Sequence, residues 1–500
     1  MSASGLLVAG TSSDAGKSLV VTGLCRALAR RGVAAAPFKA QNMSNNSAVC
    51  ADGAEIGRAQ YLQAQAARVP PESAMNPVLL KPGSDRRSHV VVRGRPAGTL
   101  EAGQYATGRR HLAEAAWSAY EELADRFELV VCEGAGSPAE INLRSGDYVN
   151  LGLARRFGLP CVVVGDIDRG GVFASLYGTV ALLEPEDRAV IRSFLVNKFR
   201  GDPDVLQPGL DELTRRTGVP FAGVLPWLPG VWLDAEDTLE VGAWRRTDRS
   251  LSPACPELVE GSKGALRVAV IRLPRVSNLT DVEALAAEPG VDVLVTTDPD
   301  VVAGADLAVL PGSRATVSDL GWLRTTGLAA VLADRASRGA PVLGICGGYQ
   351  MLAGALDDPV ESGAGAVEGL GLLPTRVAFG EAKVLGRPVG QWHGHRVEAY
   401  EIHHGVATLD DGAEPFLDGA RVGQVWGTMW HGTLENDRFR RGWLAEVAAA
   451  AGSTWVPDSG AAGYRDRREQ MIETLADAVD AHVDLDLLLA GTQVALGARR

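Results

Sequence analysis

Long apolar runs are missing from this sequence, since none approaches the roughly 18 to 20 residues that a membrane-spanning helix needs. The first residues, MSASGLLVAGTSS, also lack the basic stretch and the long apolar core of a secretory signal. Positive charge is in deficit, because 49 Lys and Arg stand against 61 Asp and Glu. We therefore expect a cytoplasmic protein that binds neither nucleic acid nor an anionic membrane nonspecifically. Its expected partners are small molecules.

Cysteine is scarce as well, with six residues among 500 and no CxxC pair. A disulfide framework and a cysteine zinc site are therefore not expected. A cysteine that matters here would act as a nucleophile. The six are Cys25, Cys50, Cys132, Cys161, Cys255 and Cys346.

What the chain does have is apolar side chains, at 46% of all residues, which is enough to build the cores of two or three globular domains. In the first half, short apolar runs alternate with helix-length amphipathic segments such as Lys17–Arg31. Short runs with this spacing are typical of a parallel sheet whose crossover helices cover both faces. The runs are Leu6–Ala9, Val33–Phe38, Leu129–Cys132, Cys161–Val164 and Phe194–Val196.

The segment Thr247–Gly264 loses this periodicity and collects Ser, Pro, Gly and charged residues, as linkers do. A second α/β pattern begins at Arg267 and includes LAVLPGS, PVLGICGGYQ and VGQVWGTMWHG. The sequence therefore predicts an α/β protein with two doubly wound domains. The expected bounds are 1–248 for the first domain, 249–265 for the linker, 266–450 for the second domain and 451–500 for a helical extension.

A predicted strand runs into GTSSDAGKS, Gly10 to Ser18, and then into a predicted helix, which is the context of a phosphate-binding loop. Backbone N–H groups there can cradle phosphates, Lys17 can reach the β and γ phosphates, and the Ser18 hydroxyl can ligate Mg²⁺. The alternative is an ordinary glycine-rich turn. The predicted ATP contacts are Gly10, Thr11, Asp14, Gly16, Lys17, Ser18 and Asn197.

Five residues, rather than the usual four, separate Gly10 from Gly16 in this loop. This spacing resembles the dethiobiotin synthetase family, whose members use ATP to phosphorylate a carboxylate. Partition ATPases are the nearest competitor, but their additional lysine would stand where this chain has Ser12. The spacing therefore favours the synthetases.

Glu133 ends a predicted strand and is placed to be a second Mg²⁺ ligand beside the loop. A surface glutamate that opens a turn is the alternative. Asp166 and Asp168 end another strand, where helix capping explains them equally well. The asparagine-rich stretch Gln41–Val49 suits either turns or a polar substrate wall.

The stretch Pro341–Leu352, PVLGICGGYQML, reads as a strand, a sharp turn that carries Cys346, and a helix. Its glycines allow the tight turn, and the helix N-terminus favours a thiolate. The N–H groups of Gly312 and Gly347 could together bind an oxyanion. The alternative is a buried structural cysteine, against which the glycine pattern argues.

A cysteine nucleophile needs a base, and five histidines are candidates: His393, His395, His403, His404 and His431. His431, in MWHG, resembles the catalytic histidine of class I glutamine amidotransferases of the cobyrinate-amidating kind. Most of that class carry a glutamate two residues further on, where this chain has Thr433. Glu435 could orient His431 in place of that missing glutamate. Without an orienting acid, hydrolysis of free glutamine should be slow.

Taken together, the motifs resemble the cobyric acid synthase family over essentially the whole chain. The resemblance rests on GTSSDAGKS, FKAQNMSNNSAV, MNPVLLKP, CEGAGSPAEINL, LGICGGYQML, YEIHHG and MWHG. It implies ATP- and glutamine-dependent amidation of the b, d, e and g carboxylates of adenosylcobyrinic acid a,c-diamide. The alternatives are amidation of another carboxylate, a P-loop switch ATPase and a cobamide-binding regulator.

Overall fold

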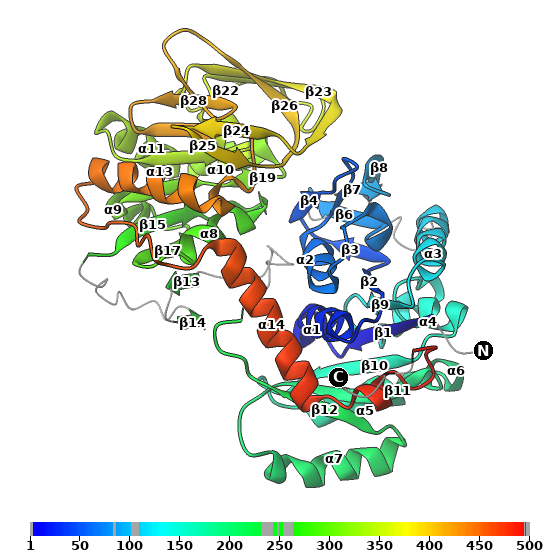
Figure 1. Cartoon of the computed structure of the whole chain (residues 1–500). Coiled ribbons are helices and arrows are strands. Elements are labelled where there is room, and N and C mark those ends of the chain that lie inside the picture. Colours follow the sequence, from blue (N-terminus) through cyan, green and yellow to red (C-terminus); the bar gives the residue numbers. More distant parts are fainter. Residues whose placement is uncertain are drawn as a thin grey trace.

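The computed structural model describes residues 4–83, 87–101, 110–231, 244–247, 250–253, 264–494 and 496. They form two α/β units, each built on its own sheet, and a C-terminal helix that runs from one unit to the other (Figure 1). Within the described residues, no helix is both long enough and apolar enough to cross a membrane.

The first unit is built on a six-stranded parallel sheet of order β12-β11-β10-β1-β9-β2. The apolar runs that predicted strands in this half are confirmed, each as a strand of this sheet. The strands are β1 (Gly5–Gly10), β2 (Ala35–Phe38), β9 (Leu129–Glu133), β10 (Cys161–Asp166), β11 (Ile191–Phe199) and β12 (Phe221–Pro226).

Helices cover both faces of this sheet, so its central strand is apolar throughout. Leu6 and Val8 of β1 pack toward one core, whereas Leu7 and Ala9 pack toward the other. The first core is closed by α1 (Lys17–Arg30) and α2 (Arg58–Ala67). The other helices of the unit are α3 (Arg110–Ala124), α4 (Leu151–Phe157), α5 (Val172–Ala181), α6 (Pro185–Arg188) and α7 (Pro203–Thr217).

The first unit also contains a small sheet of order β3-β6-β7-β8, which lies on the side of that unit nearest the second unit (Figure 1). Together with the hairpin β4-β5, it fixes the asparagine-rich stretch between the two units. These strands are not predicted from the sequence, because most are short and lack a clear alternation of apolar and polar residues. They are β3 (Gln41–Met43), β4 (Ser47–Val49), β5 (Glu55–Gly57), β6 (Val78–Pro82), β7 (Arg87–Val92) and β8 (Arg95–Glu101).

The second unit has a nine-stranded sheet of order β14-β13-β17-β15-β18-β20-β29-β28-β27, whose five strands from β17 to β29 run parallel. The edge strands β13 and β14 lie before and inside the expected linker, so this sheet begins earlier than the expected domain boundary. Cys255 lies outside the described residues. The strands are β13 (Trp244–Thr247), β14 (Ser250–Pro253), β15 (Leu266–Ile271), β17 (Val291–Thr296), β18 (Leu307–Leu310), β20 (Val342–Ile345), β27 (Glu414–Phe416), β28 (Gly419–Val422) and β29 (Val425–Thr428).

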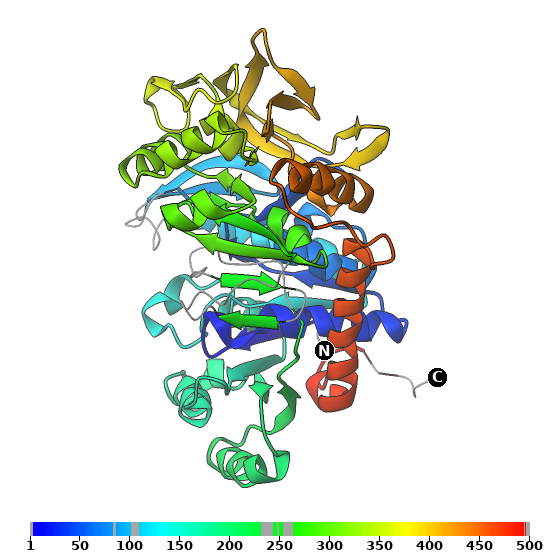
Figure 2. The same cartoon turned by 90° about the vertical axis from the view of Figure 1, so that its left-hand side faces the viewer.

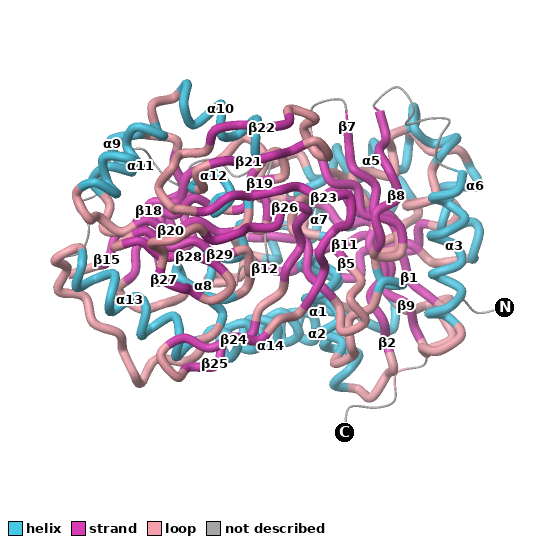
Figure 3. The backbone as a smooth tube through the Cα atoms, turned by 90° about the horizontal axis from the view of Figure 1, so that it is seen from above, coloured by secondary structure: helices cyan, strands magenta, loops and turns pink. Residues whose placement is uncertain are grey.

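Helices and a largely antiparallel insertion complete the second unit (Figures 2 and 3). The helices are α8 (Glu283–Ala286), α9 (Pro299–Gly304), α10 (Thr316–Thr325), α11 (Leu328–Ser337), α12 (Gly347–Leu352) and α13 (Asp437–Ala450). The remaining strands are β16 (Val276–Ser277), β19 (Gly312–Ser313), β21 (Ala355–Asp358), β22 (Gly365–Glu368), β23 (Thr375–Gly386), β24 (Val389–Trp392), β25 (His395–Glu398) and β26 (Glu401–Leu409).

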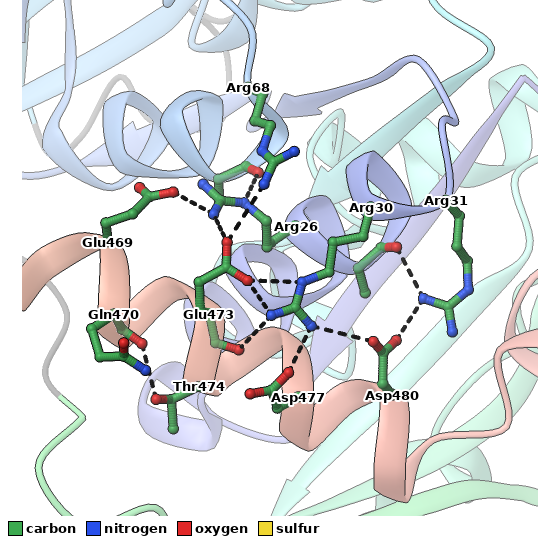
Figure 4. Close-up of polar contacts among 12 residues, drawn as sticks. Arg26, Arg30, Arg31, Arg68, Glu469, Gln470, Glu473, Thr474, Asp477 and Asp480 are labelled. Carbon is green, nitrogen blue, oxygen red and sulfur yellow. Dashed lines mark hydrogen bonds and ion pairs between the residues drawn. The ribbon is translucent and has the colours of Figure 1, made fainter. Parts of the chain in front are cut away.

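Helix α14 (Tyr464–His482) returns from the second unit and packs along α1, followed by the short α15 (Leu485–Leu488) (Figure 1). Arginines of α1 face carboxylates of α14 along this contact (Figure 4). Arg26 is 1% exposed and pairs with Glu469 and Glu473, and Arg30 also pairs with Glu473. Because Arg26 is buried, removing its partners would leave an uncompensated charge.

Gly23 lies where α1 touches α14. A Cβ added there would come within 2.8 Å of Val479 Cγ2 and 2.9 Å of Leu475 O. Replacing a helix-interior glycine by alanine normally stabilises by about 1 kcal/mol. At Gly23 we expect the opposite sign, a loss of about 1 to 3 kcal/mol, because the helices must separate. Calorimetric melting of Gly23→Ala should show a lower midpoint than the wild type.

Gly178, inside α5, is the matched control, because among the described residues no atom beyond its own stretch of helix backbone lies within 4 Å of its added Cβ. Gly178→Ala should raise the melting midpoint. A rise in both variants would show that α14 does not hold α1 closely.

Candidate functional site

The phosphate-binding loop connects β1 to α1, as its motif predicts. Gly16 has φ +91°, a conformation that glycine adopts readily, and a Cβ there would lie 2.1 Å from Asn197 Nδ2. Asn197 Nδ2 donates a hydrogen bond to Ala15 O at 3.0 Å. The Thr11 N–H donates to Val164 O at 2.9 Å. Asn197 therefore contacts the backbone of the loop and supports its conformation.

Lys17 lies within this loop and is 4% exposed. Its Nζ donates to the carbonyl oxygens of Ser12 at 2.8 Å, Ser13 at 3.1 Å and Gly136 at 3.2 Å. These carbonyls hold the ammonium group against the backbone of the loop, and its contact with the phosphates stays a prediction.

Glu133 lies directly beside the loop, at the end of β9. Ser18 Oγ donates to Glu133 Oε1 at 2.8 Å, and the carboxylate is 1% exposed. Lys39 Nζ and Gln63 Nε2 donate to the same carboxylate at 2.9 and 2.5 Å. A hydroxyl and a carboxylate are the oxygen donors that Mg²⁺ takes in nucleotide sites, so these residues fit that ion.

Asp14 and Asp166 are joined by one lysine at the other side of the loop. Lys198 Nζ donates to the Asp14 carbonyl oxygen at 2.8 Å and to Asp166 Oδ2 at 2.7 Å. The Asp14 carboxylate pairs with Arg169 at 2.9 Å, and Asp168 pairs with Arg200 at 3.2 Å. Each of these three carboxylates therefore forms an ion pair with a lysine or arginine side chain at the edge of the sheet.

Cys346 stands on a sharp turn between β20 and α12, with φ +50° and ψ −109°. A Cβ at Gly344 would lie 2.8 Å from Tyr349 N, and one at Gly348 would lie 1.9 Å from Leu310 O. Only glycine allows this turn, which lifts Cys346 out of the strand. The strained backbone at a cysteine is what a nucleophile elbow requires.

His431 follows β29, and its ring contacts both a carboxylate and the cysteine. Its Nδ1 lies 2.7 Å from Asp281 Oδ2, while the N–H of Gly432 donates to Asp281 Oδ1 at 2.8 Å. Burial lowers the pKa of His431, but the charges of Asp281 and Cys346 and their hydrogen bonds outweigh it and raise this pKa to about 10. The charged form of the ring is therefore favoured beside Cys346.

The hypothesis that Glu435 orients His431 is wrong. Glu435 pairs instead with Arg58 of the first unit and with Arg468 of α14 at 3.3 Å. Asp281 takes the place of the expected acid, so the reason for expecting slow hydrolysis of free glutamine falls away. Thr433 is buried beside this loop at 4% exposure.

The Cys346 pocket draws on both units, because Lys81 of the first unit lines it. His403 and His404 also line it, whereas His393 and His395 belong to the β24-β25 hairpin. Within the part of the chain that the structure describes, no three His, Cys, Asp or Glu residues are placed to hold a metal. The lining is Lys81, Ser277, Asn278, Ser313, Arg314, Thr316, Cys346, Gln350, Glu361, Lys383, Ile402, His403, His404 and His431.

Gly312 and Gly347 lie next to residues that line this pocket. A Cβ at Gly312 would come 3.3 Å from His431 Cε1, and one at Gly347 would come 2.7 Å from Ser313 N. Both expected oxyanion residues are therefore close to the His431 side of the Cys346 turn, and their role in binding an oxyanion stays a prediction.

The YEIHHG stretch lies against the histidine. The Tyr400 ring stacks on the His431 ring with centroids 5.3 Å apart, and the two backbones exchange hydrogen bonds of 3.0 and 2.8 Å. This contact fixes the position of the histidine ring.

Comparison with known proteins covers both units. Residues 6–240 match the CobQ/CobB/MinD/ParA nucleotide binding domain, and residues 267–439 match the CobB/CobQ-like glutamine amidotransferase domain. A cobyric acid synthase of Cutibacterium acnes is 64% identical over 97% of this chain and 99% of its own length. The chain belongs to the cobyric acid synthase family.

Other members of the cobyric acid synthase family are also close. Those of Mycolicibacterium gilvum and Streptomyces avermitilis are 58% and 56% identical, over 97% of this chain and 96% and 95% of their own lengths. A solved glutamine amidotransferase covers 37% of this chain and 98% of its own, with 19% identity and a TM-score of 0.31. Family membership makes the chain an enzyme, with a nucleotide-binding domain and a glutamine amidotransferase domain.

The role of Asp281 is not predicted from the sequence, because this residue lies 150 positions from His431. One signal is present, since the segment SNLTDVEALA, which follows a predicted strand, carries two acidic residues, Asp281 and Glu283, among apolar ones. A buried carboxylate needs a partner, and His431, which lacks the glutamate expected near it in the sequence, is such a partner.

Asp281→Asn should reduce glutamine hydrolysis by up to about 10⁴-fold, because the amide cannot stabilise the imidazolium or hold its tautomer. The pKa of His431, which Asp281 raises, should fall. The alkaline limb of the rate profile should therefore move to lower pH. Steady-state release of glutamate across pH 6 to 11 measures both effects.

Glu435→Gln is the matched control, since its carboxylate pairs with arginines and not with His431. It should retain glutamine hydrolysis. Equal losses in the two variants would contradict the assignment of Asp281.

Proposed function

We propose that the chain performs ATP- and glutamine-dependent amidation of the b, d, e and g carboxylates of adenosylcobyrinic acid a,c-diamide, giving adenosylcobyric acid in the cytoplasm. The supporting observation is that one chain holds both a phosphate-binding loop, in which Lys17 bonds to loop carbonyls and Ser18 donates to Glu133, and a Cys346 elbow beside His431. Membership of the cobyric acid synthase family supports a corrinoid carboxylate as the substrate.

The Cys346 half releases ammonia from glutamine. The thiolate attacks the side-chain amide carbon, and the N–H groups near Gly312 and Gly347 receive the charge that develops on the oxygen. The imidazolium of His431 then gives its proton to the departing ammonia, leaving a thioester on Cys346. Neutral His431 next takes a proton from water, which hydrolyses the thioester to glutamate.

The phosphate-binding half makes the carboxylate reactive. A substrate carboxylate attacks the γ phosphorus of ATP, ADP leaves as the bond to the bridging oxygen breaks, and an acyl phosphate forms while Lys17 stabilises the charge of the transferred group. Mg²⁺ held by Ser18 and Glu133 would neutralise charge on the phosphates. Ammonia then attacks the acyl phosphate, and inorganic phosphate leaves.

Ammonia must stay unprotonated between the two steps, because ammonium is not a nucleophile. A route inside the protein meets this need, and the Gln41–Val49 stretch of the first unit contacts Asn278 and Leu279 of the second unit beside the Cys346 pocket. The decisive assay incubates the protein with ATP, Mg²⁺, glutamine and the diamide, and follows amidation by mass spectrometry. No change with the diamide, but amidation of another polycarboxylate, would overturn the substrate assignment.

Cys346→Ala should abolish glutamine-dependent amidation while preserving amidation with ammonium salts at high pH. The phosphate-binding half needs only ammonia and not the thioester. Mass spectrometry of the corrinoid with each nitrogen donor measures this. Equal loss with both donors would assign Cys346 a structural role.

Lys17→Ala should remove amidation with either donor, since no acyl phosphate forms without stabilisation of the transferred phosphoryl group. Glutamate release at Cys346 should persist in part. Persistence of ATP-dependent amidation in this variant would place the nucleotide site elsewhere.

A further inference from the structure

The loop that carries Asp281 is held by the nucleotide-binding domain. Ser47 N donates to Asn278 Oδ1 at 2.8 Å, and Leu279 N donates to Asn46 Oδ1 at 3.2 Å. Each asparagine side chain thus receives a backbone N–H from the other unit. Asn46 is fully buried and Asn278 is 2% exposed, so both hydrogen bonds lie out of water.

Asn278 also sets the course of the chain toward Asp281. It has φ +50°, in the left-handed region where asparagine is among the few tolerated residues. Its carbonyl oxygen accepts the Asp281 N–H at 3.0 Å and opens the short helix Leu279–Val282. Asp281 is therefore three residues from a backbone position that the other domain fixes.

We propose that Asn46 and Asn278 are positioning residues for glutamine hydrolysis, which hold the Asp281 carboxylate against His431 from across the domain boundary. The proposal rests on the proposed glutaminase activity of Cys346. It makes the glutamine site incomplete unless the asparagine-rich segment of the nucleotide-binding domain is docked on it.

Physical reasons favour a positioning role over simple packing. Each side-chain oxygen satisfies a buried backbone N–H, and loss of that acceptor leaves the N–H unpaired unless the loop moves. A shift of about 1 Å in a group that orients a catalytic residue can cost on the order of 10²-fold in rate. The reciprocal pair therefore holds Asp281 in place for His431.

Asn278→Gly tests this, because glycine tolerates the positive φ and only the side-chain acceptor is lost. We expect kcat for glutamine hydrolysis to fall by about 10- to 100-fold, with little change in KM for glutamine. The alkaline limb of the rate profile should move to lower pH, as in Asp281→Asn. Amidation with ammonium salts should be unchanged, which also reports that the full chain is folded.

Two further variants separate positioning from folding. Asn278→Asp retains an acceptor oxygen for Ser47 N and should recover most of the lost rate. In the Asp281→Asn background, Asn278→Gly should cost almost nothing more, because its effect passes through Asp281. Asn46→Ala should reproduce the loss in kcat from the other side of the boundary.

Unchanged glutamine hydrolysis in Asn278→Gly would overturn the proposal, as would a full further loss in the Asp281→Asn background. Loss of ammonia-dependent amidation that Asn278→Asp does not restore would show a folding role and also overturn it. A wild-type chain that releases no glutamate would instead overturn the proposed function, so the two failures are distinguishable.

Discussion

The buried carboxylate of Asp281 is the constraint on which the glutamine site depends. One of its oxygens is 2.7 Å from the ring of His431 and the other accepts the N–H of Gly432, so a single side chain fixes both the ring and its backbone. That carboxylate keeps the imidazolium charged beside Cys346. Without it, the nucleophile elbow would present a thiol with no charged partner.

The same region joins the two units through a second buried charge. Glu55 of the first unit is fully buried and pairs with Lys81 at 2.6 Å and with Lys383 of the second unit at 2.5 Å. Burial raises the pKa of Glu55, but the two lysines hold it well below its usual range, while burial lowers the pKa of Lys81 to about 8. A buried pair of this kind adds little stability by itself, yet a docked arrangement without Lys383 would leave the buried Glu55 carboxylate with Lys81 alone. The buried charges therefore make the docking of the two units specific to the arrangement that pairs them.

Local motifs account for what the sequence predicts. The loop from Gly10 to Ser18, the elbow at Cys346 and the central strands of both sheets each follow from a few neighbouring residues, whereas edge strands such as β12, β13 and β14 are not predicted. The place of Glu133 follows from the edge of a parallel sheet. Asp281 and Asn278 do not, because their partners lie 150 and 231 positions away. Glu435 was favoured by closeness in sequence, whereas the fold turns its carboxylate to Arg58.

The central claim is that nitrogen released at Cys346 is consumed at the phosphate-binding loop of the same molecule. Glutamine labelled with heavy nitrogen in its amide, supplied together with excess unlabelled ammonium near neutral pH, tests this directly. The corrinoid amides should carry the heavy label almost completely. Dilution of the label in proportion to free ammonium would contradict the claim, because it would show that ammonia leaves the protein before it reacts.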